Sequence, residues 1–136
     1  FKSVYTKDWE FLFDLNREVN NYILSALNIQ TKLIYSSDLN IERKKDELVL
    51  ELCQKSDATT YLSGALGRSY LNEEAFKGKG INVVYQDYKH PHYKQEKRKN
   101  FEHNIAVIDL LFNSGSESIE IILSGNINKT KMDEVL

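Results

Sequence analysis

Along the chain, segments with apolar residues at helical spacing alternate with short, continuous apolar segments. Between residues 8 and 27, apolar side chains recur at helical spacing, which predicts a helix with one buried stripe. A similar pattern predicts a second helix over residues 43–55. Short β-branched and aromatic segments bounded by polar turns predict strands at residues 31–35, 59–62 and 81–85.

The middle of the chain places glycine-containing and polar segments between these elements. Residues 63–67 form a loop directly after the second predicted strand, and residues 73–77 predict one helical turn. Residues 86–100 are polar and contain the single proline, Pro91. We expect a long loop there, and loops of this kind are usually functional or mobile.

The last apolar stretch, residues 105–112, suits either a buried helix or a strand, and we favour the helix. Ser114 and Glu117 then have capping-box spacing ahead of a final helix that reaches Leu123. Helices that alternate with strands imply crossover connections and a largely parallel sheet. The predicted fold class is therefore α/β: a layered fold with a largely parallel sheet flanked by helices.

Composition and charge narrow the class of protein. The 136 residues include 41% hydrophobic and 28% charged side chains, which is ordinary for one globular domain. The net charge of −2 argues against a nucleic-acid binder, and no apolar run approaches the roughly 20 residues needed for membrane insertion. A lone cysteine, Cys53, suits a reducing cytoplasm. Because the chain begins at Phe1, without methionine, we expect it to be part of a longer protein.

Polar or glycine-containing segments follow each predicted strand. In open α/β sheets, ligands bind beyond the carboxyl ends of the strands. Parallel strands would bring these segments to one edge, where tyrosines add groups that stack and form hydrogen bonds. The substrate-binding candidates that result are Ser36, Ser37, Asp38, Tyr61, Ser63, Gly64, Gly67, Arg68, Tyr70, Gln86 and Tyr93.

These segments also have structural explanations. Ser36, Ser37 and Asp38 carry side chains that cap helices, so capping and ligand contact are about equally favoured. The glycines of residues 63–67 are able to present backbone N–H groups to an anion, with Arg68 beside them. That segment matches neither the P-loop nor the dinucleotide pattern, and an ordinary turn is the simpler explanation.

The histidines raise the question of a metal ion. His90 and His92 flank Pro91, and His103 lies downstream. Two histidines at this spacing can share an ion in an extended segment, but no acidic pair nearby has suitable spacing, so we predict no metal. A single histidine that acts as a general base or as a hydrogen-bonding group fits better, and His90 is the candidate catalytic residue.

Asp109 is the second candidate catalytic residue. It lies within the apolar segment 105–112, and a buried carboxylate there needs a partner, either a backbone N–H group or a histidine. Cys53 falls on the apolar face of a predicted helix, so we interpret it as core packing rather than as a nucleophile.

Read in order, many of these segments resemble the WbqC-like protein family over roughly residues 15–123. The matching residues are 27–31, 36–39, 61–64, Gly67, Tyr70, Leu71, Phe76, Gly80, Ile81, 86–88, His90, Pro91, Tyr93, Gln95, 108–113 and Gly115. Family members are longer, and the chain is similar to their C-terminal half. The resemblance implies that residues 1–136 are a single α/β domain or the C-terminal half of a longer WbqC-like domain, with a site shared between halves.

The last of these motifs departs from the family pattern. The family typically has Pro and Ser ahead of its Ile-Ile-Asp, where this chain has His103 and Ala106. A role for that seryl hydroxyl is therefore unsupported in this chain.

The resemblance implies a bacterial cytoplasmic protein of O-antigen or other surface-polysaccharide biosynthesis. It also implies a transferase that places an amino acid such as glycine on a nucleotide-linked or lipid-linked sugar. In that hypothesis the glycine loop and Arg68 hold an anionic group, and His90 accepts a proton. Asp109 or Asn113 would orient that histidine or the sugar. Because no established nucleophile, metal set or cofactor motif is present, the alternative is a non-catalytic ligand-binding or scaffolding subunit of a polysaccharide assembly pathway.

Overall fold

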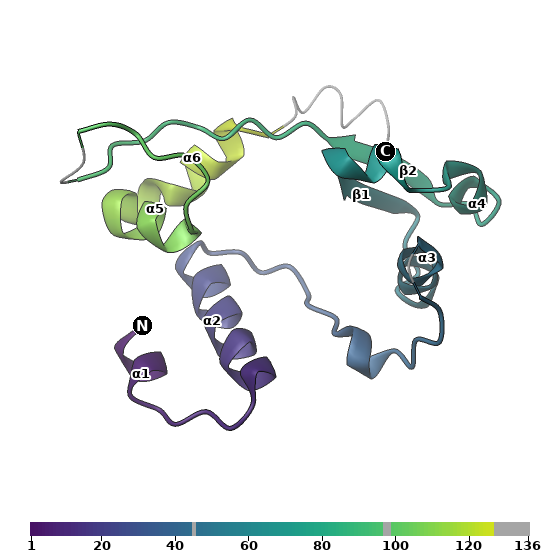
Figure 1. The fold of residues 1–136 in the computed structure, drawn as a ribbon, viewed down its shortest axis with the longest axis horizontal. Coiled ribbons are helices and arrows are strands. Elements are labelled where there is room, and N and C mark those ends of the chain that lie inside the picture. Colours follow the sequence, from purple (N-terminus) through teal and green to yellow (C-terminus); the bar gives the residue numbers. More distant parts are fainter. Residues whose placement is uncertain (45, 97–98, 127–136) are drawn as a thin grey trace. The chain divides into compact units, whose positions relative to one another are not determined.

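The computed structural model describes residues 1–44, 46–96 and 99–126 (Figure 1). The elements run α1 (Lys2–Tyr5), α2 (Leu12–Ala26), η1 (Ser36–Asp38), α3 (Asp46–Lys55), β1 (Thr60–Gly64), η2 (Ala65–Ser69), α4 (Glu73–Lys77), β2 (Asn82–Gln86), α5 (Val107–Ser114), η3 (Gly115–Glu117) and α6 (Ser118–Ser124). They belong to two compact units. Unit 1 contains residues 1–31 and 90–125, and unit 2 contains residues 32–89 with Asn126.

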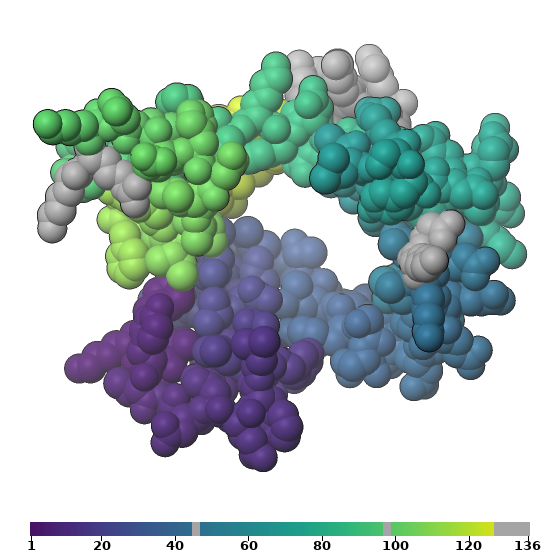
Figure 2. Space-filling view, in the orientation of Figure 1, coloured from purple at the N-terminus to yellow at the C-terminus, as the bar shows by residue number. Residues whose placement is uncertain are grey.

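A small parallel sheet in unit 2 confirms the α/β class. Strands β1 and β2 pair in parallel, with Tyr61 opposite Val83 and Ser63 opposite Tyr85. Helix α4 lies between them in sequence, so the connection is a short crossover. In the space-filling view of Figure 2 this region is coloured teal.

The strand predicted at residues 31–35 is wrong. Within the described residues the sheet has two strands, and residues 31–35 form neither strand nor helix. The β-branched and aromatic residues of this segment do favour a strand. A strand also needs a partner with which to share backbone hydrogen bonds. Here Leu33 and Ile34 leave nearly half of their surface exposed.

The predicted helices are present, and α2, α3 and α5 begin later than expected. Phe11 has an extended backbone, with φ −118° and ψ 134°, so α2 begins at Leu12 rather than near residue 8. The indole N–H of Trp9 donates to the carbonyl oxygen of Val4 at 2.9 Å, which holds the preceding turn. The expected buried stripe is weaker than predicted, because α2 contains no fully buried residue and the burial is concentrated at Leu27, just after the helix.

The capping box predicted at Ser114 is also wrong. Helix α5 includes Ser114, and Gly115 follows it with φ +51°, a left-handed conformation that favours glycine. The turn η3 then leads into α6, whose N-cap is Glu117 and lacks a side-chain cap bond. The buried serine of this region is Ser118, whose hydroxyl donates to the carbonyl oxygen of Leu110 at 3.3 Å and joins the two helices.

The core of unit 2 lies where α3 and α4 meet the sheet. Cys53, Phe76 and Ile81 are buried together, and Phe76 is only 2% exposed. The ring of Tyr61 stacks on that of Phe76, with centroids 5.6 Å apart and planes 17° apart. Among the described residues, no helix is long and apolar enough to cross a membrane.

We predict that Cys53 reacts slowly while the chain is folded. Burial raises the pKa of its thiol, so less of the reactive thiolate is present at any given pH, and the core restricts access to the sulfur. Labelling with a disulfide reagent should therefore follow the unfolded fraction across a urea series. Fast and complete labelling in the absence of urea would contradict this placement.

Candidate functional site

Unit 1 contains a polar network between the long loop and helix α5. The hydroxyl of Tyr93 donates to Oδ2 of Asp109 at 2.9 Å. Asp109 lies in the first turn of α5 and is half-buried, so this bond supplies the partner that its carboxylate needs. The expected partner was a histidine or a backbone N–H group, whereas the side-chain partner found is a tyrosine.

Asn113 and Gln95 complete the network. Oδ1 of Asn113 accepts the backbone N–H of Glu96 at 2.7 Å, and its Nδ2 donates to the carbonyl oxygen of Asp109 at 2.7 Å. The Oδ1 bond fastens the loop to α5, and the Nδ2 bond lies within α5 and holds the amide in place. A substrate that bound the Asn113 amide, as predicted, would have to replace these hydrogen bonds.

Gln95 is a residue that sequence reasoning missed. It is 8% exposed, and its amide pairs with the backbone of Glu102: Oε1 accepts the N–H at 2.8 Å, and Nε2 donates to the carbonyl oxygen at 3.0 Å. Nε2 also donates to the hydroxyl oxygen of Tyr93 at 3.3 Å. Its only signal in the sequence was its place in the family motif.

His90 lies beside this network. Its Nδ1 is 3.0 Å from the carbonyl oxygen of Pro91, which suits the tautomer that carries its proton on Nδ1. In that tautomer Nε2 is the basic nitrogen. The imidazole centroid is 6.4 Å from the ring of Tyr93 and 6.0 Å from that of Phe101. Among the described residues, no hydrogen bond joins His90 to Asp109.

The other two histidines pack against Phe101. His92 stacks on this ring at 4.3 Å, and His103 meets it edge-on at 4.7 Å. The His92 and His103 rings are 4.9 Å apart. In the described parts of the chain, no three His, Cys, Asp or Glu residues are arranged to hold a metal ion.

The second group of candidates lies at the carboxyl ends of β1 and β2 in unit 2. The loop predicted at residues 63–67 consists of the end of β1 and the start of η2, and we call residues 63–69 the strand-end loop. Ser63 is buried and its hydroxyl donates to the carbonyl oxygen of Gly64 at 3.2 Å. A Cβ atom at Gly67 would overlap Oγ of Ser63 and press against Leu71, so glycine is required there for close packing. At Gly64, which is exposed, an added Cβ would instead meet no atom within 4 Å.

Arg68 lies over the ring of Tyr85, with its guanidinium carbon 4.2 Å from the ring centroid. The hydroxyl of Tyr85 donates to Oε1 of Glu73 at 2.7 Å, and this bond raises the pKa of the phenol because ionisation would remove the shared proton beside a carboxylate. Tyr70 is more than half exposed nearby. The amide of Gln86 donates to Oδ1 of Asn126 at 2.9 Å.

The remaining candidates do not join these groups. Tyr61 is part of the core of unit 2, stacked on Phe76. Ser36, Ser37 and Asp38 form the exposed turn η1, where the hydroxyl of Ser37 donates to Asp38 at 3.3 Å. This turn is not an N-cap, since α3 begins only at Asp46. It also follows a segment that pairs with neither strand, so the predicted placement at the sheet edge has lost its basis.

The chain is thus an α/β protein with a tyrosine–aspartate network in unit 1 and a glycine-containing loop at the strand ends of unit 2. Residues 1–121 match the model of the WbqC-like protein family, and the chain belongs to that family.

A relative is the uncharacterized protein Rv1507c of Mycobacterium tuberculosis. It is 38% identical over 104 residues, which cover 76% of this chain and 45% of that protein. The chain therefore spans less than half the length of this relative. No solved structure matches the chain.

Replacement of Gly67 tests the close packing of the strand-end loop. Gly67→Ala should lower the free energy of unfolding by about 1–3 kcal/mol, because the added methyl group overlaps Ser63. Gly64→Ala is the matched control: φ is −67° and no atom lies within 4 Å of the added group, so the change should stay within about 0.5 kcal/mol. Equal effects in urea unfolding would refute the packing argument.

Gln95→Glu tests the amide pairing in unit 1. A carboxylate at this position cannot donate to the carbonyl oxygen of Glu102, so we expect a loss of about 1–3 kcal/mol in the free energy of unfolding. The loss should shrink at acidic pH, where the carboxyl is protonated and donates again. Gln30→Glu, at an exposed position of the same unit, should show neither effect.

Proposed function

We propose that the chain is part of a transferase of bacterial surface-polysaccharide biosynthesis, such as O-antigen assembly, that acts in the cytoplasm. Its proposed substrate is a nucleotide-linked or lipid-linked sugar, and the transferred group is an amino acid such as glycine. The observation that carries the proposal is the half-buried network around Tyr93 and Asp109, with His90 beside it. Membership of the WbqC-like family is the basis for the pathway.

In this mechanism His90 is the general base. Its Nε2 accepts the proton of a sugar hydroxyl or amino group as that group attacks the activated carboxyl carbon of the amino-acid donor. The bond to the donor's leaving group breaks, and the leaving group departs with the electron pair. The contact between Nδ1 and the carbonyl oxygen of Pro91 supports this role, because it favours the tautomer whose Nε2 is unprotonated.

Asp109 is a positioning residue in this proposal rather than the direct partner of His90. Its carboxylate orients the hydroxyl of Tyr93, and Gln95 donates to the same hydroxyl, so the ring beside His90 is fixed from two directions. Rigid support of this kind holds a catalytic group near its productive geometry.

Unit 2, taken by itself, offers a separate proposed contact for an anion at Gly64 and the guanidinium of Arg68. Gly64 has open space around it, and Arg68 is exposed and lies over Tyr85. The exposed ring of Tyr70 is a proposed stacking surface for a sugar.

The first test is turnover by the full-length protein supplied with nucleotide sugars and an activated glycine donor, with products identified by mass spectrometry. His90→Ala should lower turnover about 10²- to 10⁴-fold, the usual range for loss of a general base. His92→Ala is the control, because this exposed imidazole lies in the same loop but has no assigned chemistry. Circular dichroism should show that both variants fold.

Full activity of a folded His90→Ala protein would remove the proposed base. Calorimetry with the same nucleotide sugars separates the two functions: tight binding without any product would identify a non-catalytic binding subunit. Arg68→Gln should weaken that binding, since it removes the proposed anion contact.

A further inference from the structure

A second concave site lies in unit 2 between helices α3 and α4. The pocket has a volume of about 600 Å³ and draws its lining from both helices. Leu50, Ala75 and Phe76 supply an apolar part, and charged side chains surround it. Pockets of about 300–1,000 Å³ with an apolar lining and a few polar groups commonly bind small molecules. None of the residues assigned to the proposed transferase lines this pocket.

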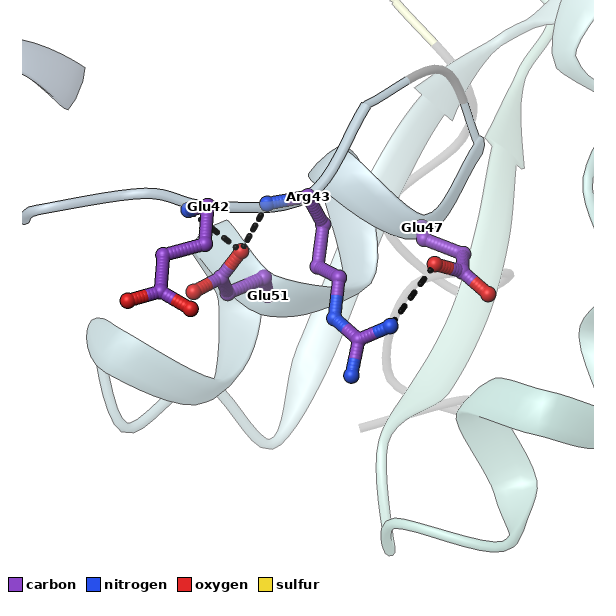
Figure 3. Close-up of polar contacts among 4 residues, drawn as sticks. All are labelled: Glu42, Arg43, Glu47 and Glu51. Atoms are coloured by element: carbon purple, nitrogen blue, oxygen red, sulfur yellow. Dashed lines mark hydrogen bonds and ion pairs between the residues drawn. The ribbon is translucent and has the colours of Figure 1, made fainter.

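The charged side chains at the rim of the pocket differ in how many hydrogen bonds and ion pairs they form. Glu51 accepts the backbone N–H groups of Glu42 and Arg43 at 3.1 and 2.8 Å (Figure 3). The bond from the Arg43 N–H is the main reason why the pKa of Glu51 is lowered. Lys55 is 3.5 Å from Glu51 and donates to the carbonyl oxygen of Asn40 at 2.6 Å. Glu51 and Lys55 therefore fasten the segment before α3 to the helix.

Two cations at the rim are available to a ligand. The guanidinium of Arg43 reaches Glu47 at 3.2 Å, as Figure 3 shows, but both side chains are about two-thirds exposed. An exposed pair of this kind is weak and exchanges readily with another anion. Lys79 takes part in none of the ion pairs found among the described residues.

The backbone presents Lys79 on a fixed turn. Its N–H donates to the carbonyl oxygen of Phe76 at 2.9 Å, and the next residue, Gly80, has φ +72°. This left-handed conformation favours glycine and ends the turn that follows α4. Lys79 thus lines the pocket from the α4 side, and Arg43 lines it from the α3 side.

We propose that the α3–α4 pocket binds a small organic oxyanion, either a carboxylate or a phosphate monoester, that carries an apolar body. Arg43 and Lys79 hold the oxyanion, and the apolar body lies on Leu50 and Ala75. Glu47 competes with the ligand for Arg43, so the exposed ion pair opens when the ligand binds. The site is separate from the strand-end loop that contains Arg68.

The test is a titration of the ¹⁵N-labelled chain, followed by NMR. Phenyl phosphate and benzoate distinguish the two oxyanions, while inorganic phosphate and benzyl alcohol each supply only half of the proposed ligand. We expect saturable shifts of α3 and α4 amides with phenyl phosphate or benzoate, and much weaker binding of the two half-ligands.

Charge variants give the decisive pattern. Arg43→Gln and Lys79→Gln should each weaken binding about five- to tenfold, since each removes a charge-assisted contact. Glu47→Gln should tighten it by up to about threefold, because it removes the competing carboxylate. Lys77→Gln, an exposed α4 lysine outside the pocket, is the matched control and should leave binding unchanged.

Three results would overturn the proposal: no saturable α3 or α4 shifts at millimolar ligand, equal weakening by Lys77→Gln and Lys79→Gln, or weakening by Arg68→Gln instead. The last result would place the anion at the strand-end loop. Lys79 lies outside both helices, so Lys79→Gln keeps the test valid if Arg43→Gln disturbs the start of α3. Failure here leaves the His90 proposal intact, because the two use different residues and measurements.

Discussion

The burial of Phe76 is the packing interaction on which unit 2 depends. Its ring lies in the core with Cys53 from α3 and Ile81 from the segment entering β2, and it stacks on Tyr61 of β1. Two short strands alone are marginally stable in water, so this shared apolar contact, rather than the strand pairing, keeps the elements together. The pocket and the strand-end loop both extend from this core.

The sequence pattern was sufficient to predict an element where the secondary-structure preference of a segment agreed with the burial of one of its sides. The segments that became β1 and β2, the turn at α4 and the helix at α5 were all identified, because each combines suitable residues with a side that is at least partly buried. Residues 31–35 show the limit: their β preference was real, but strand formation depends on a partner elsewhere in the chain. Capping by Ser114 failed for a related reason, since α5 continued through that residue to Gly115.

The candidate site was anticipated in part. His90, Tyr93 and Asp109 were named as candidates, and their roles stay predictions. Asp109 was expected to meet a backbone N–H group or a histidine, and its side-chain hydrogen bond is to Tyr93. Both phenol and imidazole would satisfy a half-buried carboxylate, and the choice depends on the path of a long loop without helical or strand periodicity. Gln95 was missed because its role is to pair with the backbone of Glu102, which no local pattern reveals.

The contact between Ser63 and Gly67 has a consequence for how this family can vary. The space that a side chain at position 67 would need is occupied largely by the side chain at position 63. The two positions are therefore energetically coupled, and the effect of substituting one depends on the residue at the other. Removal of the Ser63 hydroxyl would therefore relieve most of the overlap at position 67 and leave the contact with Leu71.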